Sequence, residues 1–215
     1  MTNDESTAKP ESSEILSNVQ HLIVATRNGH KTREIQRILG ADFAVRDLSA
    51  YPATAETVES GKTLEENAVL KATAASRQLP GLVVADDSGL EVDALGDAPG
   101  IYSARYAGPN ATDKQNIDKL LAELARIKRA KRSARFRCAI ALAREGKLLA
   151  TFEGVVEGVI VDRPSGTSGF GYDPVFMPRE FDKTFGQLSP AEKDRVSHRA
   201  HALEKLRVRL SSEAK

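Results

Sequence analysis

The feature of this sequence that most restricts its fold is a change of pattern near residue 134. Before that point, short apolar runs such as "HLIVAT" (21–26) and "LVVAD" (82–86) alternate with helical segments, which is typical of buried strands. After it, "RFRCAIALAR" and "KLLATFEGVVEGVIV" stand next to each other with a Gly between them. We interpret these two segments as an antiparallel hairpin whose long second strand bends at Gly154 or Gly158. The combination predicts an α/β fold with a mixed sheet.

Local signals place the helices of this fold. A first helix after residue 30 is expected to end at Gly40. The patterns T-x-x-E at 63–66 and T-x-x-Q at 112–115 are capping boxes, so a helix should begin at each of them. "SPAE" (189–192) is a further helix start, and we expect one last helix from there to the end of the domain, with its leucines packed inward.

Composition narrows the class of protein. Lys+Arg number 31 and Asp+Glu 30, so bulk charge favours neither nucleic acid nor a membrane surface as a partner. No apolar run approaches the roughly 20 residues that span a bilayer, and the polar N-terminus does not resemble a signal peptide. The lone Cys138 lies in an apolar run, which fits a reducing compartment. We therefore predict a soluble cytoplasmic protein with a disordered extension at 1–18 and one domain at 19–212.

Two polar segments that follow predicted strands are the first candidates for a functional site. "TRNGHK" (26–31) leads from a strand into a helix, where backbone N–H groups and Lys31 can bind an anion such as phosphate. An ordinary polar turn is the alternative. Asp86 and Asp87 are expected at the carboxyl end of a buried strand, where open α/β sheets bind ligands. Carboxylates there suit Mg²⁺, which needs only one or two of them when phosphate supplies the other oxygens, although an Asx-turn is an equally simple reading.

The remaining candidates lie further along the chain. Lys71 shares a helix face with an amide four residues earlier and could reach a phosphate chain, and Glu59 in the preceding loop could be a metal ligand. A solvated helix face and a surface carboxylate are the alternatives. In "SGFGYDP" (168–174) an aromatic ring could stack on a base or simply fill the core. His198 and Arg199 could donate hydrogen bonds to a carbonyl such as a purine 6-oxo group, or form a polar helix cap.

Five segments taken together resemble the inosine triphosphate pyrophosphatase family, most closely its bacterial dITP/XTP branch. They are "VATRNGHKTREIQRIL", "TLEENAVLKA", "VADDSGLEVDALGDAPGIYSARYAG", "GFGYDPVF" and "LSPAEKDRVSHR", in order between about residues 21 and 210. The resemblance implies an elongated, two-lobed single domain with a mixed α/β sheet and a nucleotide cleft between the lobes. It also implies hydrolysis of nonstandard purine nucleoside triphosphates (ITP, dITP, XTP) to the monophosphate and pyrophosphate, with Mg²⁺ as cofactor and a homodimeric assembly.

The resemblance also implies roles for individual residues. Asp87 matches the family's proton acceptor and a metal ligand, and Glu59 matches a second metal ligand. The residues that match substrate-binding positions are Thr26, Arg27, Asn28, Gly29, His30, Lys31, Lys71, Ser88, Phe170, Gly171, Tyr172, Asp173, Lys193, His198 and Arg199.

Two other functions remain open at this point. The basic run "RIKRAKRSARFR" (126–137) could serve an RNA-interacting or nucleotide-binding module without turnover. Alternatively, an enzyme of the same kind could act on modified or standard pyrimidine nucleotides.

Overall fold

The sheet confirms the prediction of a mixed α/β fold. A computed structural model describes residues 19–55, 57–128 and 131–213, so the expected disordered extension (1–18) lies outside the described residues. Six strands are hydrogen-bonded in the order β2-β1-β3-β4-β5-β6. The first three strands run parallel, and β3 to β6 pair antiparallel. Their bounds are β1 Gln20–Val24, β2 Phe43–Asp47, β3 Leu82–Val92, β4 Ser133–Arg144, β5 Lys147–Ile160 and β6 Phe176–Pro178.

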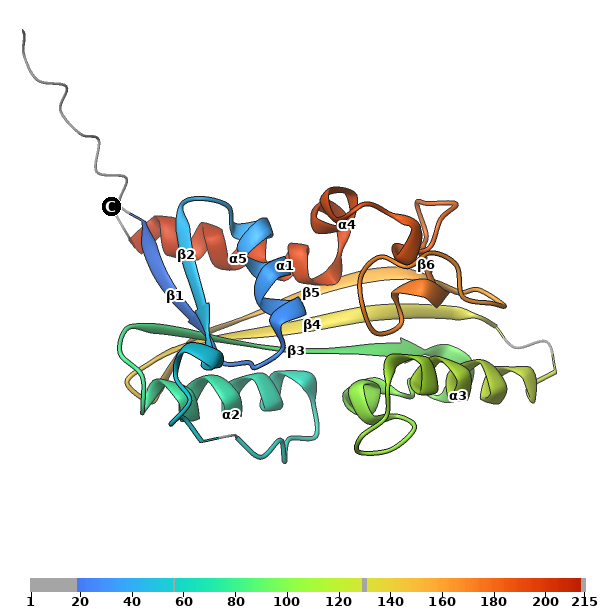
Figure 1. Cartoon of the computed structure of the whole chain (residues 1–215), viewed down its shortest axis with the longest axis horizontal. Coiled ribbons are helices and arrows are strands. Elements are labelled where there is room, and N and C mark those ends of the chain that lie inside the picture. Colours follow the sequence, from blue (N-terminus) through green and yellow to red (C-terminus); the bar gives the residue numbers. More distant parts are fainter. Residues whose placement is uncertain (1–18, 56, 129–130, 214–215) are drawn as a thin grey trace, which may run out of the picture.

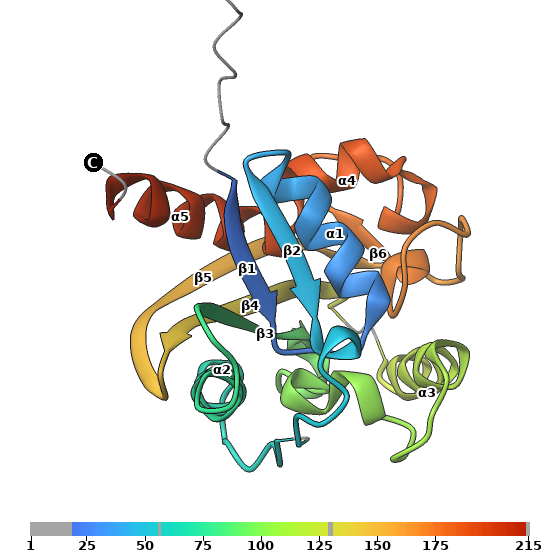
Figure 2. The same cartoon turned by 60° about the vertical axis from the view of Figure 1, so that its left-hand side comes forward.

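Helices cover both faces of this sheet. The α-helices are α1 Gly29–Leu39, α2 Leu64–Ser76, α3 Asp113–Ala125, α4 Pro190–Val196 and α5 His198–Glu213. The 3-10 helices are η1 Leu48–Ala50, η2 Asp93–Leu95, η3 Gly100–Arg105, η4 Asp173–Val175 and η5 Phe185–Gln187. Helices α1 and α5 lie on one side of the sheet and α2 on the other (Figures 1 and 2). Among the described residues, no helix combines the length and the apolar character that crossing a membrane requires.

The hydrophobic core divides along the length of the molecule. One cluster packs α1 and α5 against one sheet face, and a second packs the alanines of α2 against the opposite face. A third cluster joins α3, β6 and the far ends of β3 and β4. The first two clusters form one lobe and the third forms the other, with the long strands β3 to β5 running through both (Figure 1).

The predicted hairpin is β4 and β5, joined by Glu145 and Gly146, both with positive φ. The register of this pair shifts between Leu142 and Ala143. The glycines expected at a bend allow close packing: a Cβ at Gly154 would collide with the carbonyl oxygen of His198, and one at Gly158 with that of Met177. The missing side chains therefore bring the start of α5 and β6 close to β5.

The prediction that the acidic pair ends a strand is wrong. Strand β3 continues through Asp86 and Asp87 to Val92 because β4 pairs with it along this whole length, with Asp86 opposite Ile140. Strand β1, in contrast, pairs with β3 only as far as Val84. The two aspartates thus lie beyond the end of the parallel part of the sheet, which is where a ligand can approach.

The predicted single last helix is in fact two. Ser189 caps α4 with a complete capping box, but the chain leaves helical geometry at Ser197, whose ψ is 156°. The hydroxyl of Ser197 accepts a hydrogen bond from the N–H of Ala200, and α5 begins there. The break places His198 and Arg199 in the first turn of a new helix, whose leucines are buried as predicted.

The capping boxes differ in how closely they follow the prediction. The box of α3 is complete, with Thr112 as N-cap. At α2 only half of it forms: the Thr63 hydroxyl accepts from the N–H of Glu66, while the Glu66 carboxylate accepts from the N–H of Lys62. Both helices begin where the sequence predicts.

Candidate functional site

A cleft of about 610 Å³ lies between the two lobes. It is bounded by the loop after β1, by α2 and the loop before it, by the middle of β3, by η3, by the Gly-rich loop before η4, and by the start of α5. The predicted site residues on its wall are Thr26, Arg27, Asn28, Lys31, Glu59, Lys71, Asp87, Ser88, Phe170, Gly171, Tyr172, Asp173, Lys193, His198 and Arg199. Gly29 and His30 do not line it. His30 lines a smaller adjoining hollow, where its ring is 5.6 Å from that of Phe170.

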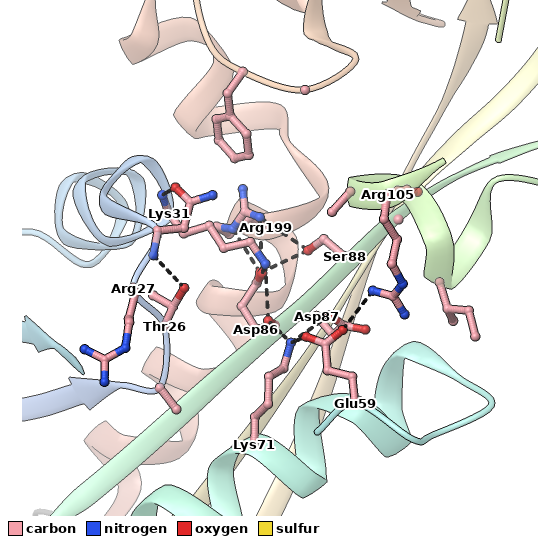
Figure 3. Close-up of a pocket in the computed structure, with 18 of the residues that line it drawn as sticks. Thr26, Arg27, Lys31, Glu59, Lys71, Asp86, Asp87, Ser88, Arg105 and Arg199 are labelled. Atoms are coloured by element: carbon pink, nitrogen blue, oxygen red, sulfur yellow. Dashed lines mark hydrogen bonds and ion pairs between the residues drawn. The ribbon is translucent and has the colours of Figure 1, made fainter. Parts of the chain in front are cut away.

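Asp86 is held on one side of β3 by cations (Figure 3). Its carboxylate accepts from Arg199 Nε at 2.9 Å and forms an ion pair with Lys31. The Ser88 hydroxyl and the Cys138 thiol donate to it as well. Burial alone would raise the pKa of Asp86, but attraction to Arg199 and Lys31 outweighs burial and holds the pKa well below its usual value. Asp86 is therefore a fully compensated, permanently ionised carboxylate at neutral pH.

Asp87 faces the other side of the strand, toward α2. Its Oδ1 accepts from Lys71 Nζ at 2.7 Å, and its Oδ2 accepts from Asn67 Nδ2 at 3.3 Å. Burial raises the pKa of Asp87, and the attraction of Lys71 offsets this only in part. A buried carboxylate with a raised pKa in a cleft is a candidate proton acceptor.

Lys71 is the cation around which the polar groups on the Asp87 side of β3 gather. Its ammonium donates to Glu59 Oε1 at 3.0 Å, to the Asp86 carbonyl at 3.0 Å and to Asp87. An ammonium has three donors, so all of them are engaged. Burial alone would lower the pKa of Lys71, but its carboxylate neighbours, Asp87 first, raise it. Lys31 Nζ donates to the same Asp86 carbonyl at 3.3 Å, so two cations from different helices converge on one point of the cleft.

Glu59 lies in the loop before α2, where two cations bind its carboxylate. Besides Lys71, Arg105 from η3 donates to its Oε2 at 3.3 Å (Figure 3). Although burial acts to raise it, the pKa of Glu59 is lowered because Lys71 and Arg105 attract the ionised form. Glu59 and Asp87, the two predicted metal ligands, thus converge on a single ammonium.

The donor set of these two carboxylates fits a hard divalent cation. Within the described residues, three or more His, Cys, Asp or Glu side chains do not gather into a metal-binding cluster. Mg²⁺, however, normally takes only one or two protein carboxylates and completes its shell with water and phosphate oxygens. Because Glu59 and Asp87 already share one cation, the pair matches that requirement.

The predicted phosphate loop forms the N-terminus of α1. Asn28 is the N-cap, and its Oδ1 accepts from the N–H groups of His30 at 2.9 Å and Lys31 at 3.4 Å. These backbone donors are therefore capped rather than free. The guanidinium of Arg27 donates to the carbonyls of Leu48 and Thr54, and so holds the neighbouring loop. Lys31 is the residue of this loop whose charge reaches the aspartates.

Aromatic and cationic side chains form the opposite end of the cleft. The ring of His198 is stacked on Phe136 with centroids 4.8 Å apart. Burial, reinforced by nearby Arg199 and Lys193, holds the pKa of His198 well below its usual value, so the ring is neutral at pH 7. Its Nδ1 is buried without a hydrogen-bond partner. Phe170 is half-buried, with the ammonium of Lys193 5.0 Å from the centre of its ring.

Two predicted residues at this end are tied into the protein. Tyr172 is 4% exposed, packs in the third core cluster and donates its hydroxyl to the Ser103 carbonyl at 2.9 Å. Asp173 accepts from Lys193 Nζ at 2.6 Å and from the N–H of Phe170 at 2.8 Å. Burial raises the pKa of Asp173, and Lys193 counteracts this. Asp173 thus fixes both the Gly-rich loop and the buried lysine.

Three residues that the sequence did not assign to the site are part of it. Arg105 comes from η3, and no local pattern marks it. Asn67 was expected to face a phosphate, but it is fully buried and holds Asp87 and the N–H of Gly61. Glu34 is buried on α1 beside Arg199. The sequence did contain an indication of this position, because Glu34 is an acidic residue that lies on the apolar face of that helix.

Comparisons with known proteins agree with the resemblance in the sequence. A sequence model of the Ham1 family matches residues 22–209. The dITP/XTP pyrophosphatase of Bacillus licheniformis is 49% identical over 189 residues, which cover 87% of this chain and 96% of that protein. These likenesses extend over both lobes and the whole cleft.

Solved structures show the same arrangement of elements. The Staphylococcus aureus Ham1 protein superposes with a TM-score of 0.80 at 41% identity, over 90% of this chain and 100% of the other. A nucleoside-triphosphatase / dITP/XTP pyrophosphatase from Mycobacterium abscessus gives a TM-score of 0.69 at 41% identity, over 87% and 98% of the two chains. The predicted two-lobed mixed α/β fold is confirmed.

Proposed function

Since the chain belongs to the Ham1 family, we propose that it hydrolyses nonstandard purine nucleoside triphosphates (ITP, dITP and XTP) to the monophosphate and pyrophosphate. This activity would cleanse the nucleotide pool and keep such bases out of DNA and RNA. The observation that carries the proposal is the difference between the two ends of the cleft. Two lysines and two carboxylates meet at one end, a neutral histidine and an aromatic ring lie at the other, and Arg199 lies between them, bound to Asp86.

Asp87 is the proton acceptor in this proposal. It removes a proton from the water that attacks the α-phosphorus, and its raised pKa makes it a stronger base than an exposed aspartate. Asn67 and Lys71 orient its two oxygens. The charge that develops on the leaving pyrophosphate is stabilised by Lys31 and by the positive field of Lys71.

Glu59 and Asp87 would hold Mg²⁺ together with the substrate phosphates. When bound there, the ion supplies charge neutralisation for the phosphate oxygens. The protein's own part is to hold Glu59 in its ionised form through Lys71 and Arg105, and to direct both carboxylates toward Lys71. Ser88 lies on the same side of β3 as Asp86, to which its hydroxyl donates, and would contact the substrate from that side.

Base selection follows from the other end of the cleft. The unpartnered Nδ1 of His198, as an N–H, is a donor that suits the 6-oxo group of a purine. Arg199 can add the second N–H of its Nη1. Its other donors are engaged, because Nε and Nη2 are bound to Asp86 and Ser88 and the first N–H of Nη1 is bound to Glu34. The 6-amino group of adenine would place a donor against donors and leave buried groups unpaired. Phe170 and Gly171 would contact the base from the Gly-rich loop.

A substrate panel tests the proposal. ITP, dITP, XTP, GTP, ATP, dTTP and dUTP are incubated with the protein and Mg²⁺, and pyrophosphate and phosphate are measured separately. We expect pyrophosphate from the first three, with a kcat/KM roughly 100-fold above that for ATP. Absence of pyrophosphate from every nucleotide would refute the proposal, release of single phosphates would indicate a phosphohydrolase, and preference for dTTP or dUTP would indicate a pyrimidine enzyme.

The arrangement of the basic run does not favour an RNA-binding module. Of residues 126–137, positions 129 and 130 lie outside the described residues. Arg132 pairs with Asp162, and Arg135 and Arg137 both pair with Glu91, so carboxylates compensate these arginines. A homodimeric assembly and a cytoplasmic location are part of our proposal, the first from the family resemblance and the second from the single buried cysteine.

A further inference from the structure

Glu34 is a buried carboxylate next to two cations of the cleft, and it has no role in the proposed reaction. It is 2% exposed and lies on α1, one turn after Lys31. Its Oε2 accepts from Arg199 Nη1 at 2.9 Å. Its Oε1 is 3.7 Å from Lys193 Nζ and has no hydrogen-bond partner. A buried carboxylate is costly unless it is compensated, so its two cationic neighbours explain why it is tolerated there.

The position of Glu34 joins three helices. Arg199 belongs to α5, Lys193 to α4, and Glu34 to α1, whose first turn carries Lys31. Glu34 thereby connects α1 directly to the cations of α4 and α5, in addition to the link that Asp86 makes between Lys31 and Arg199. A second pair, Arg37 with Asp194 at 2.6 Å, also joins α1 to α4; the side chain of Arg37 is 46% exposed, and neither residue lines the cleft.

Glu34 is also the middle of an alternating chain of charges. Along the buried wall of the cleft, the order of contacts is Asp173, Lys193, Glu34, Arg199, Asp86, Lys31. Three carboxylates thus balance three cations. Without the charge of Glu34, Arg199 would keep Asp86 and Ser88 as partners, and Asp173 would be the carboxylate left to Lys193. Either cation could then shift toward the partners that remain, because its position is no longer set from two sides.

We propose that Glu34 is a positioning residue for base selection. It fixes Arg199 and Lys193 relative to Lys31, so that the base and the phosphates of one substrate are held at the correct positions relative to each other. The proposal rests on the proposed function of the cleft. Arg199 must present its donors to the 6-oxo group at a fixed place if a 6-amino group is to be rejected. A displacement of about 1 Å can cost on the order of 100-fold in rate, so the effect should fall on the preferred substrate more than on ATP.

The test compares Glu34→Gln with the unaltered protein. The substitution keeps the shape of the side chain and removes its charge. We expect kcat/KM for ITP to fall about 30-fold while that for ATP changes little, so that the ratio of ITP to ATP falls roughly tenfold or more. Glu34→Asp, which keeps the charge on a shorter side chain, should recover part of the ratio. Asp194→Asn is the matched control, since it breaks the exposed α1–α4 pair and should leave the ratio unchanged.

Each outcome decides between the explanations. A Glu34→Gln protein that folds, judged by circular dichroism, and keeps the ITP-to-ATP ratio within twofold would overturn the proposal. An equal loss for both nucleotides would also overturn it, because it would indicate a merely structural role. If Glu34→Gln does not fold, Glu34→Asp carries the test through its shorter reach: we expect the ratio to fall about threefold, less than for loss of the charge, and a ratio within about twofold of that of the unaltered protein would overturn the proposal.

Binding separates this proposal from the proposed function. If the unaltered protein hydrolyses no nucleotide, the proposed function fails, and calorimetric titration with IMP and AMP decides the role of Glu34 alone. We expect the unaltered protein to prefer IMP and Glu34→Gln to lose most of that preference. Equal binding of IMP and AMP by the unaltered protein, or an unchanged preference in the variant, would overturn the proposal.

Discussion

Asp86 and Asp87 are neighbours in one strand, yet they lie in opposite environments. Asp86 faces α1 and α5, where Arg199 and Lys31 hold its pKa well below the usual value despite its burial. Asp87 faces α2, where Lys71 is its principal cation and burial keeps its pKa raised. Two identical side chains thus differ in the direction of their pKa shift. Arg199 and Lys31 both bind the Asp86 carboxylate, whereas Asp87 is bound by Lys71 alone among the cations that the structure describes and is repelled by Glu59.

The period of a β-strand explains this separation. Successive side chains point to opposite faces of a sheet, so adjacent carboxylates need not share a site or repel each other directly. Their partners in β4 confirm the alternation: Ile140, opposite Asp86, packs with α1 and α5, and Ala139, opposite Asp87, packs with α2. One strand can therefore carry a structural acid and a reactive acid side by side.

Asp87→Asn should produce the largest difference between the two sides. We expect kcat for ITP to fall about 1000-fold, because the proton acceptor is lost, while the far-ultraviolet circular dichroism spectrum is unchanged. Asp93→Asn, which removes an exposed carboxylate just beyond the end of β3, is the control and should retain activity. Turnover by Asp87→Asn at near the original rate would remove Asp87 from the role of base.

Asp86→Asn should act on folding rather than on the proton transfer. The substitution leaves the buried Arg199 with one carboxylate fewer, and breaking a buried ion pair in this way costs about 3–5 kcal/mol. The free energy of unfolding from urea titrations measures this loss. A loss below about 1 kcal/mol would show that Arg199 finds compensation elsewhere, and the division between a structural and a reactive acid would not hold.

The pH dependence of stability should show a smaller effect with opposite signs for the two residues. Because the folded-state pKa of Asp86 is lowered, its ionised form stabilises the fold above the unfolded value of about 3.9, and this is lost as the pH falls through the folded pKa. Because the pKa of Asp87 is raised, its contribution is present below the unfolded value and is lost as the pH rises through the folded pKa.

Urea titrations between pH 7 and pH 3 test these signs. Relative to the unaltered protein, Asp86→Asn should lose less free energy of unfolding on acidification below about pH 4. Asp87→Asn should lose more between neutral pH and about pH 4, since it lacks the group that gains a proton there. Identical pH profiles for both variants would contradict the difference between the two environments.

The sequence predicted those parts of the fold whose signals are local. The helix starts at Thr63 and Thr112, the hairpin and the stop at Gly40 each depend on residues close together in the chain, and each is found where expected. The end of the strand at Asp86 was predicted wrongly, because polar residues normally close a buried strand. The strand continues because it pairs with β4, whose paired residues lie between 42 (Val92 with Ala134) and 54 (Asp86 with Ile140) positions further along the chain. The break at Ser197 was also missed, since nothing in "DRVSHRA" forbids a continuous helix.

The sequence by itself determined where most helices begin, the β4–β5 hairpin and the family, because cap hydrogen bonds, periodicity and extended motifs are all written in residue order. The tertiary structure decided what these residues do to one another. It turned Asp86 and Asp87 to different cations, engaged every donor of Lys71, and brought Arg105 to the cleft and Glu34 to its buried contact with Arg199. Such effects depend on distance and burial in three dimensions, and an electrostatic environment of this kind exists only when segments far apart in the chain have packed together.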